Sequence, residues 1–288
     1  MSEPETLARS IKEGLPNPSL EFWEATKCDA NENLLAAQAE SDSAVADKFW
    51  FLHKVALVRE QYLKCFNDIK AGKFYDAWCG LERAEIELSW LKRNPFFCPT
   101  EFGVLVLERQ VQNWQSLFPY TIFFSPAILE KRKECGICGA VVDPWTACGH
   151  EVGSVYGGRE CIHNVTAADF LEISIVLDPV QKYSVAHEVL DKDGNTVDHH
   201  DYSPVTFVAD RLSSPFDGWS VRKTKAWHPH SRYSGVPPQA PCPCESGRRY
   251  ADCCLTKRGV LRPHFAIEFE KEPPADLPTL VFSRDVSD

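Results

Sequence analysis

The sequence Pro241-Cys-Pro-Cys-Glu-Ser-Gly-Arg-Arg-Tyr-Ala-Asp-Cys-Cys254 places four cysteines in two tight pairs, separated by a short spacer that favours a turn. Thiolate sulfur is a strong zinc ligand, and four ligands in a tetrahedron let so short a segment keep a shape that apolar burial could not hold. The pattern therefore predicts a zinc knuckle. Its predicted ligands are Cys242, Cys244, Cys253 and Cys254. A disulfide-rich turn or chance clustering is the alternative.

The same residues resemble the SEC-C motif, a small zinc-binding element found at the C-terminus of the secretion ATPase SecA and in many otherwise unrelated bacterial proteins. That motif runs Cys-Pro-Cys-Gly-Ser-Gly, then a basic and aromatic spacer, then Cys-Cys or Cys-His. Glu245 departs from the pattern, because glycine is usual there. The residues that fit the spacer are Ser246, Gly247, Arg248, Arg249 and Tyr250. The resemblance implies a zinc module, and contact with a protein or ribosome such as the similar motif makes in SecA.

A second candidate metal site begins at Lys133-Glu-Cys-Gly-Ile-Cys-Gly139, where two cysteines are spaced as in the knuckles of zinc ribbons. Further donors follow, so six candidates compete for four places. The favoured and most compact set is Cys135, Cys138, Cys148 and His150. Cys161 is the first replacement and His163 the second. Cysteines that merely pack, and a catalytic zinc, are the alternatives. With the knuckle, the sequence predicts two zinc ions.

Composition places the chain among globular proteins, since 44% of its 288 residues are apolar. A net charge of -10 argues against nucleic-acid binding by the whole molecule. Twelve cysteines, together with a start that has neither a basic segment nor an apolar signal core, indicate a reducing cytoplasm with metal sites. No apolar run approaches the roughly 20 residues that span a bilayer, so no membrane association is expected.

Hydrophobic periodicity predicts a helical domain over residues 1–119, built of helical hairpins. Its expected helices are a single helix or a pair over Asn31–Lys70, then Phe74–Lys92 and Thr100–Leu117. The segment Lys70–Trp78 looks like a hairpin of tetratricopeptide type, although no second copy follows at that period. Small residues at Ala77 and Ala84 suit close contact between helices.

The pattern changes to strands near residue 120. Expected strands are Tyr120–Phe124, Phe170–Leu177, Val205–Val208 and Ser220–Lys225, with a last strand-like stretch at Thr279–Phe282. The alternation of Ile173, Ile175 and Leu177 predicts a half-buried strand. Asp193-Gly194 predicts a hairpin turn, because the surrounding acidic loop lacks the glycine and glutamate positions of a calcium site. We therefore expect an α+β protein with a zinc-ribbon and β-strand domain over 120–236 and a knuckle with an acidic tail over 237–288.

Few residues suggest catalysis. The chain has no phosphate loop, dinucleotide fingerprint or nucleophile elbow. His199-His200-Asp201 and Trp227-His-Pro-His230 could support metal-dependent hydrolysis, but histidines on polar loops are more often simply solvated. The protein is therefore expected not to be an enzyme, with a metal-dependent hydrolase as a remaining alternative.

The C-terminal region has an unusual charge, with nine basic and two acidic residues between Val221 and His264. Such a segment suits an acidic protein, or a phosphate backbone with stacked bases. We expect an adaptor whose helical domain binds a protein and whose basic knuckle docks a protein or ribosomal partner. A nucleic-acid-associated protein, in phage defence or RNA handling, is the alternative. The expected contact residues are Arg222, Lys223, Lys225, Arg248, Arg249 and Tyr250.

Overall fold

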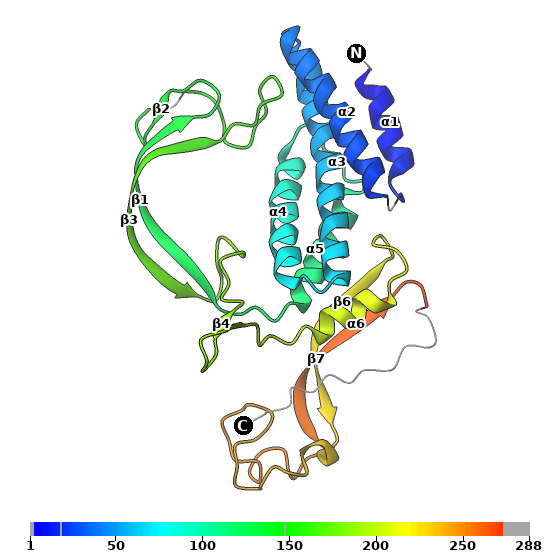
Figure 1. Ribbon diagram of the computed structural model, residues 1–288, viewed down its shortest axis with the longest axis vertical. Helices are drawn as coiled ribbons and strands as arrows, with labels where there is room; N and C mark the ends of the chain where they lie inside the picture. The colour runs from blue at the N-terminus through cyan, green and yellow to red at the C-terminus, as the bar shows by residue number, and fades with distance from the viewer. Residues whose placement is uncertain (1–2, 18, 147, 273–288) are drawn as a thin grey trace. The chain divides into compact units, whose positions relative to one another are not determined.

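The computed structural model describes residues 3–17, 19–146 and 148–272 and confirms an α+β fold (Figure 1). The helices are α1 (Pro4–Gly14), α2 (Leu20–Ala39), α3 (Ser43–Lys70), α4 (Phe74–Arg93), α5 (Val104–Leu117), α6 (Ser203–Arg211) and the 3₁₀-helix η1 (His230–Tyr233). The strands are β1 (Phe123–Cys135), β2 (Val141–Val142), β3 (His163–Val176), β4 (Val189–Leu190), β5 (Thr196–Val197), β6 (Trp219–His228) and β7 (Val260–Phe269). Two compact units result, the first ending at Phe216 and the second beginning at Asp217. The predicted three-part division stays a prediction.

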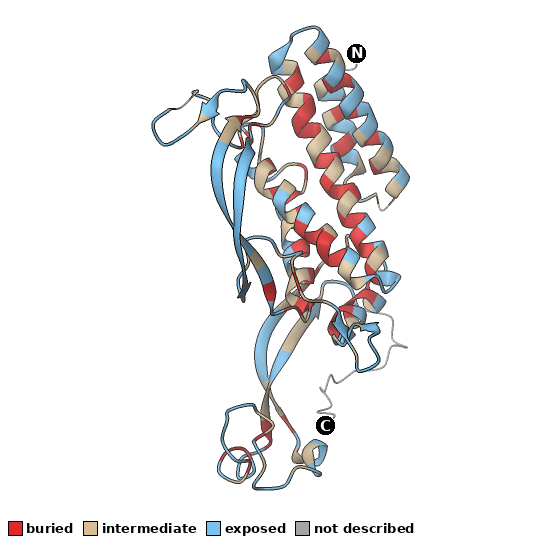
Figure 2. Cartoon of the chain, turned by 60° about the vertical axis from the view of Figure 1, so that its left-hand side comes forward, coloured by how far each residue is buried: buried red, intermediate tan, exposed pale blue. Residues whose placement is uncertain are grey.

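Helices α1 to α5 form a bundle around α3, the helix that contributes more buried side chains than any other. The segment predicted as one helix or a pair is a pair, α2 and α3, because Ser41 has a left-handed φ of 60° and Asp42 then caps α3 by accepting a hydrogen bond from the Val45 amide. Figure 2 shows the buried residues concentrated along these helices. The core therefore lies in the helical part of the first unit.

The predicted helical hairpin is confirmed by α3 and α4, which join through Gly72 at a φ of 75°. Ala77 and Ala84 are fully buried, as close contact between the two helices requires. Lys182, from the segment after β3, donates its backbone amide to the buried carboxylate of Glu82 on α4. The helical and β-rich parts of the first unit are thus joined through α4.

Strands β1 and β3 form a long antiparallel ribbon, from the pair Phe123–Val176 to the pair Cys135–His163, with β2 added beside β1 at the cysteine end. The strand predicted over Phe170–Leu177 is present and longer than expected. Its predicted half-burial is wrong: Ile173 is 62% and Ile175 is 70% exposed. Alternation predicts a half-buried strand only where a second layer covers one face, and no helix lies against this face in the described part of the chain.

The strand expected over Val205–Val208 is also wrong, because these residues belong to α6. Pro204 lies in the first turn, where its missing amide costs nothing. Val205, Val208 and Ala209 are buried at helical spacing, and α6 packs on α3. A run of four apolar and β-branched residues fits a strand or a short helix equally well, so packing decided the outcome.

In the second unit, β6 and β7 pair without a break from Trp219–Phe269 to His228–Val260, and the knuckle lies in the connection between them. The predicted hairpin turn at Asp193-Gly194 is confirmed by β4 and β5, with Asp191 accepting the Asn195 amide. The expected strand at Thr279–Phe282 lies outside the described residues. Within residues 3–272, apart from the two gaps, no helix combines the length and apolar character needed to cross a bilayer.

Candidate metal centres

The first cluster closes the end of the β1–β3 ribbon. One donor atom from each of Cys135, Cys138, Cys148 and His150 lies within 4.8 Å of every other. The local turn is fixed by backbone hydrogen bonds from Cys135 to Ala140 and from Gly139 back to Cys135, both 2.8 Å. Gly139 has a φ of 73°, which a side chain rarely adopts. The structure thus brings together the four donors that the sequence favoured.

The donors of this cluster fit a metal ion. The pKa of Cys135 is lowered to about 6, chiefly by hydrogen bonds from the backbone amides of Cys138 and Ile137, which stabilise the thiolate that a metal requires. The Nδ1 atom of His150 is buried and has no hydrogen-bond partner among the described residues. A buried nitrogen without a partner is costly unless another ligand, such as a metal, satisfies it.

Cys161 lies beside this cluster, with its sulfur 3.9 Å from that of Cys135. Its side chain is fully buried, and burial raises its pKa to about 11. His163 begins β3 opposite Cys135, but neither residue belongs to the group of donors that lie within 4.8 Å of one another. Cys161 therefore remains the adjacent replacement ligand.

The second cluster closes the end of the β6–β7 ribbon. Its four donors, Cys242, Cys244, Cys253 and Cys254, also lie within 4.8 Å of one another. Three of the four cysteines are buried and pack with Val260 in a small apolar core. In so small a unit, a bound metal would supply much of the stability that apolar burial cannot.

A hydroxyl supports the thiolates of the second cluster. The Ser246 oxygen is 3.2 Å from the sulfur of Cys253. Although burial acts to raise it, the pKa of Cys244 is held at about 6 by hydrogen bonds from Ser246 and the neighbouring thiols. Burial raises the pKa of Cys242 to about 12. Cys242 and Cys244 therefore differ in proton affinity, and a bound cation would favour the thiolate form of both.

Glu245 shows why glycine is usual at its position in the motif. Its φ is 62°, in the left-handed region that costs an ordinary residue about 1–2 kcal/mol. Its carboxylate pairs with Arg262 at 2.7 Å, and Arg262 also donates to the carbonyl of Pro243. The backbone geometry of the motif is therefore kept despite the substitution.

Tyr250 and His230 brace the knuckle from inside. Tyr250 is only 2% exposed, and its hydroxyl lies 2.6 Å from Nδ1 of His230. The other ring nitrogen of His230 is 2.8 Å from the carbonyl of Lys257. Tyr250 was expected among the contact residues, but its ring is enclosed and is not offered to a partner. His228 is also buried, and neither histidine joins a donor group in the described chain.

The basic residues of the second unit fall into two groups. Internal ion pairs hold Arg222 to Glu268 and Arg249 to Asp252, so part of their charge is neutralised locally. The other expected contact residues form no ion pair among the described residues and are exposed: Lys223, Lys225 and Arg248. Sequence counting could not separate the two groups, because the pairing of Arg222 depends on the β6–β7 register.

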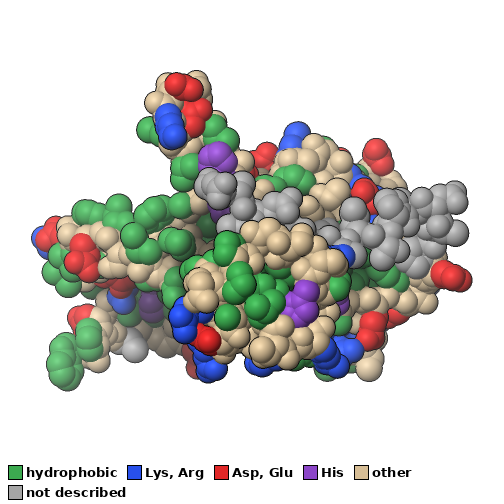
Figure 3. All heavy atoms as spheres, turned by 90° about the horizontal axis from the view of Figure 1, so that it is seen from below, with side chains coloured by type: hydrophobic (Ala, Val, Ile, Leu, Met, Phe, Trp, Pro, Cys, Tyr) green, Lys and Arg blue, Asp and Glu red, His purple; other side chains and the backbone are tan. Residues whose placement is uncertain are grey.

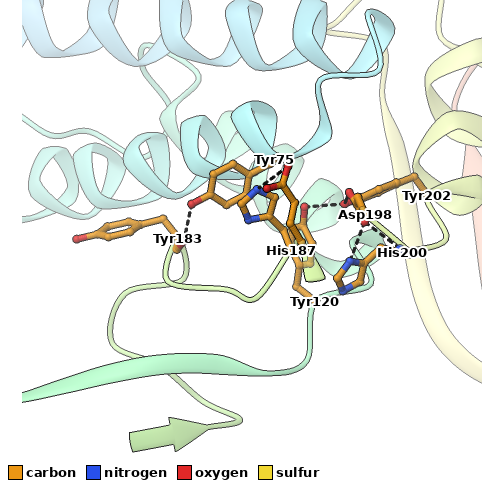
Figure 4. Close-up of polar contacts among 8 residues, drawn as sticks. Tyr75, Tyr120, Tyr183, His187, Asp198, His200 and Tyr202 are labelled. Carbon is orange, nitrogen blue, oxygen red and sulfur yellow. Dashed lines mark hydrogen bonds and ion pairs between the residues drawn. The ribbon is translucent and has the colours of Figure 1, made fainter. Parts of the chain in front are cut away.

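His200, one of the histidines considered for catalysis, takes part in a different arrangement (Figure 4). Asp198 accepts a hydrogen bond from Tyr202 at 2.6 Å and lies 2.9 Å from Nδ1 of His200. The Tyr202 hydroxyl is also 2.9 Å from that of Tyr120. Burial raises the pKa of Tyr120 to about 12, so its hydroxyl stays protonated and takes part in the network as a neutral phenol. The sequence missed Asp198, although a carboxylate two residues before a histidine is a recognisable signal.

This network anchors a loop. Tyr202 stacks on Phe74 at the start of α4, with ring centroids 4.1 Å apart. Asp201 accepts the Ser203 amide at the start of α6. A cavity of about 730 Å³ nearby is lined by Tyr75, Arg83 and other residues of both charges, without a histidine. A grouping of His199, His200 and Asp201 around a metal, which the hydrolase alternative would need, is not among the donor groups of the described residues.

Residues 240–256 match the family model of the SEC-C motif. This match confirms the resemblance, and each of the two clusters could hold a metal ion. No curated protein and no solved structure matches the chain.

Proposed function

We propose that this protein is a cytoplasmic zinc-binding adaptor whose second unit docks an acidic protein partner. The observation that supports it is the SEC-C knuckle, which is built on a buried core of cysteines and carries exposed Arg248 in its spacer. A metal in each cluster would act structurally, because four protein donors leave no open position for water or substrate. We propose zinc in both, since sulfur-rich tetrahedral sets favour it.

The exposed cations supply the specificity of this docking. Lys223 and Lys225 lie on the same face of the β6–β7 ribbon as Phe265, because their register partners in β7 are Phe265 and Pro263. The half-buried ring of Phe265 and the two ammonium groups thus form one surface, apolar at its base and basic at its edge. Such a surface suits an acidic protein segment that also carries apolar side chains.

Binding by the zinc-loaded full chain tests the proposal. The triple variant Lys223→Glu, Lys225→Glu, Arg248→Glu is expected to lose capture of its partner. A matched control is Arg9→Glu, Lys73→Glu, Lys192→Glu, which makes the same charge change at three exposed residues of the first unit. Capture unchanged in the first triple variant would overturn the docking surface.

Nuclease treatment distinguishes protein docking from the alternative, nucleic-acid binding. Partners retained after the lysate is treated with nuclease support protein docking, and partners lost support the nucleic-acid function. Burial of Tyr250 removes one of the rings that the alternative needs for base stacking. The ring of Trp227 is partly exposed, and the guanidinium of Arg258 lies 5.0 Å from its centroid. This pair is the observation that favours nucleic-acid binding.

A further inference from the structure

At the end away from the cysteines, the β1–β3 ribbon carries an exposed face of apolar side chains. Residues directly paired across two strands point to the same face. Phe124 pairs with Ile175, Pro126 with Ile173 and Ile128 with Phe170. These six residues are called the apolar face below. On the opposite face, Phe123 is buried, and the pairs Ser125–Ser174 and Ala127–Glu172 are largely polar or small.

The apolar face is large for an uncovered surface. Phe124 is 40%, Ile128 50%, Phe170 62%, Ile173 62% and Ile175 70% exposed. At roughly 200 Å² for each large apolar residue, the face exposes on the order of 600 Å², the upper end of what monomeric proteins show. Figure 3 shows hydrophobic side chains gathered on the left-hand side, where Figure 1 draws this ribbon.

The ribbon also lacks a second layer. The extensive contacts of β1 and β3 with other elements, in the residues described, are with each other and with β2. A two-stranded ribbon is marginal in water, and it gains stability when a hydrophobic face packs against something. Figure 2 shows both strands exposed along most of their length. The ribbon would therefore be stabilised by a partner surface, of similar size, that packs on its apolar face.

Charge limits what that cover can be. Three basic residues follow the apolar face along β1, and each is paired locally, in the ion pairs Lys131–Asp169, Arg132–Glu134 and Lys133–Glu130. Among the described residues, no Lys or Arg of the two strands is left without an ion pair to select an acidic partner, and Glu172, which has no ion pair among them, lies on the opposite face. In a chain of net charge -10, an uncharged apolar surface is also where two copies can meet with least repulsion.

We propose that the apolar face packs against the same face of a second copy, so that two ribbons related by a two-fold axis form one sandwich. The contact is isologous, since every side chain of the face finds its complement in the same six residues of the other copy. Packed sheets lie about 10 Å apart, a spacing that these side chains fill. Two such faces bury about 1,200 Å², the lower end of a specific interface.

Sedimentation of the zinc-loaded full chain, from about 1 µM to about 100 µM, tests the proposal. The wild type is expected to shift from monomer to dimer over this range. The double variant Ile173→Glu, Ile175→Glu is expected to raise the dissociation constant of the dimer at least roughly 100-fold, because it would bury unpaired charges. Both residues are exposed in the single chain, so circular dichroism and metal content should not change.

The control is Leu35→Glu on α2, which introduces the same charge at a residue 56% exposed outside the ribbon. It should dimerise as the wild type does. A wild-type chain that stays monomeric throughout would overturn the proposal and assign the face to a different occupant, either residues 273–288 of the same chain or another protein. A dimer that the double variant leaves intact would overturn it too.

Discussion

The β1–β3 and β6–β7 ribbons follow one plan with different surfaces. Each is a pair of long antiparallel strands, and in each a cluster of four candidate metal donors lies at the end where the two strands are connected. The first ribbon exposes an apolar face and pairs its Lys and Arg side chains locally. The second exposes Lys223 and Lys225 without ion pairs among the described residues. In both, the cluster fixes the end of the ribbon, while the strand residues decide what the ribbon can bind.

The two clusters also differ in how they are supported. The loop of the first packs on the helices: Gly158 donates its amide to Asp47 at 2.6 Å, and Gln38 donates to the carbonyl of Gly157 at 3.0 Å. The second is enclosed by residues of its own unit, among them Tyr250 and Val260. Loss of metal should therefore spread from the first cluster into the bundle and stay local at the second.

The largest effect should follow from breaking one cluster at a time. Cys135→Ser is expected to cost about 3 kcal/mol and to lower the Tm of the helical transition by about 10 °C, since about 1 kcal/mol shifts Tm by 2–4 °C in a unit of this size. Cys242→Ser should leave that transition unchanged. Thermal unfolding followed by helical circular dichroism measures both.

Elemental analysis gives the metal count for the same proteins. The wild type should hold about two zinc ions per chain, and each variant about one. Cys28→Ser, at an exposed cysteine outside both clusters, is the control and should hold two. Equal shifts of the helical transition in Cys135→Ser and Cys242→Ser would remove the distinction between the clusters.

A pair of glycines tests the packing of the two loops. Gly158 has a φ of 70°, and an added Cβ would lie 2.3 Å from Leu34 Cδ1. Gly247 has a φ of 73°, with nothing within 4 Å of an added Cβ. Gly158→Ala should therefore cost about 3 kcal/mol from strain and overlap, and Gly247→Ala about 1 kcal/mol from strain alone. Denaturant unfolding measures both, and equal costs would contradict the packing of the first loop on α2.

The sequence predicted the donors better than the surfaces. Cysteine spacing is a local property, so the eight donors of the two clusters could be identified without knowledge of the fold. The exposure of Ile173 and the burial of Tyr250 could not be predicted, because each depends on whether another segment covers that side chain. Val205 was misassigned for the same reason, since only its packing on α3 favours a helix. Local chemistry was predictable, and contacts between distant segments were not.

The hydroxyl at the second cluster gives a smaller effect. The first cluster holds Cys135 as a thiolate through backbone amides, which no substitution removes, whereas the second uses the side chain of Ser246. Ser246→Ala should lower zinc affinity about tenfold, as expected for a group that orients a ligand. Competition with a chromophoric chelator measures this. Ser234→Ala, an exposed serine of the same unit, is the control and should bind as the wild type does.

The smallest effect concerns Glu245, which has a φ of 62° and an ion pair with Arg262. Both Glu245→Ala and Glu245→Gly remove the ion pair, but only glycine also removes the backbone strain. The glycine variant should therefore be more stable than the alanine variant by about 1 kcal/mol, after allowance for the greater freedom of glycine in the unfolded chain. Thermal unfolding of the second unit, followed by differential scanning calorimetry, compares the two. An alanine variant as stable as the glycine variant would mean that the knuckle tolerates any residue at this position, and that the motif's usual glycine does not reflect backbone strain.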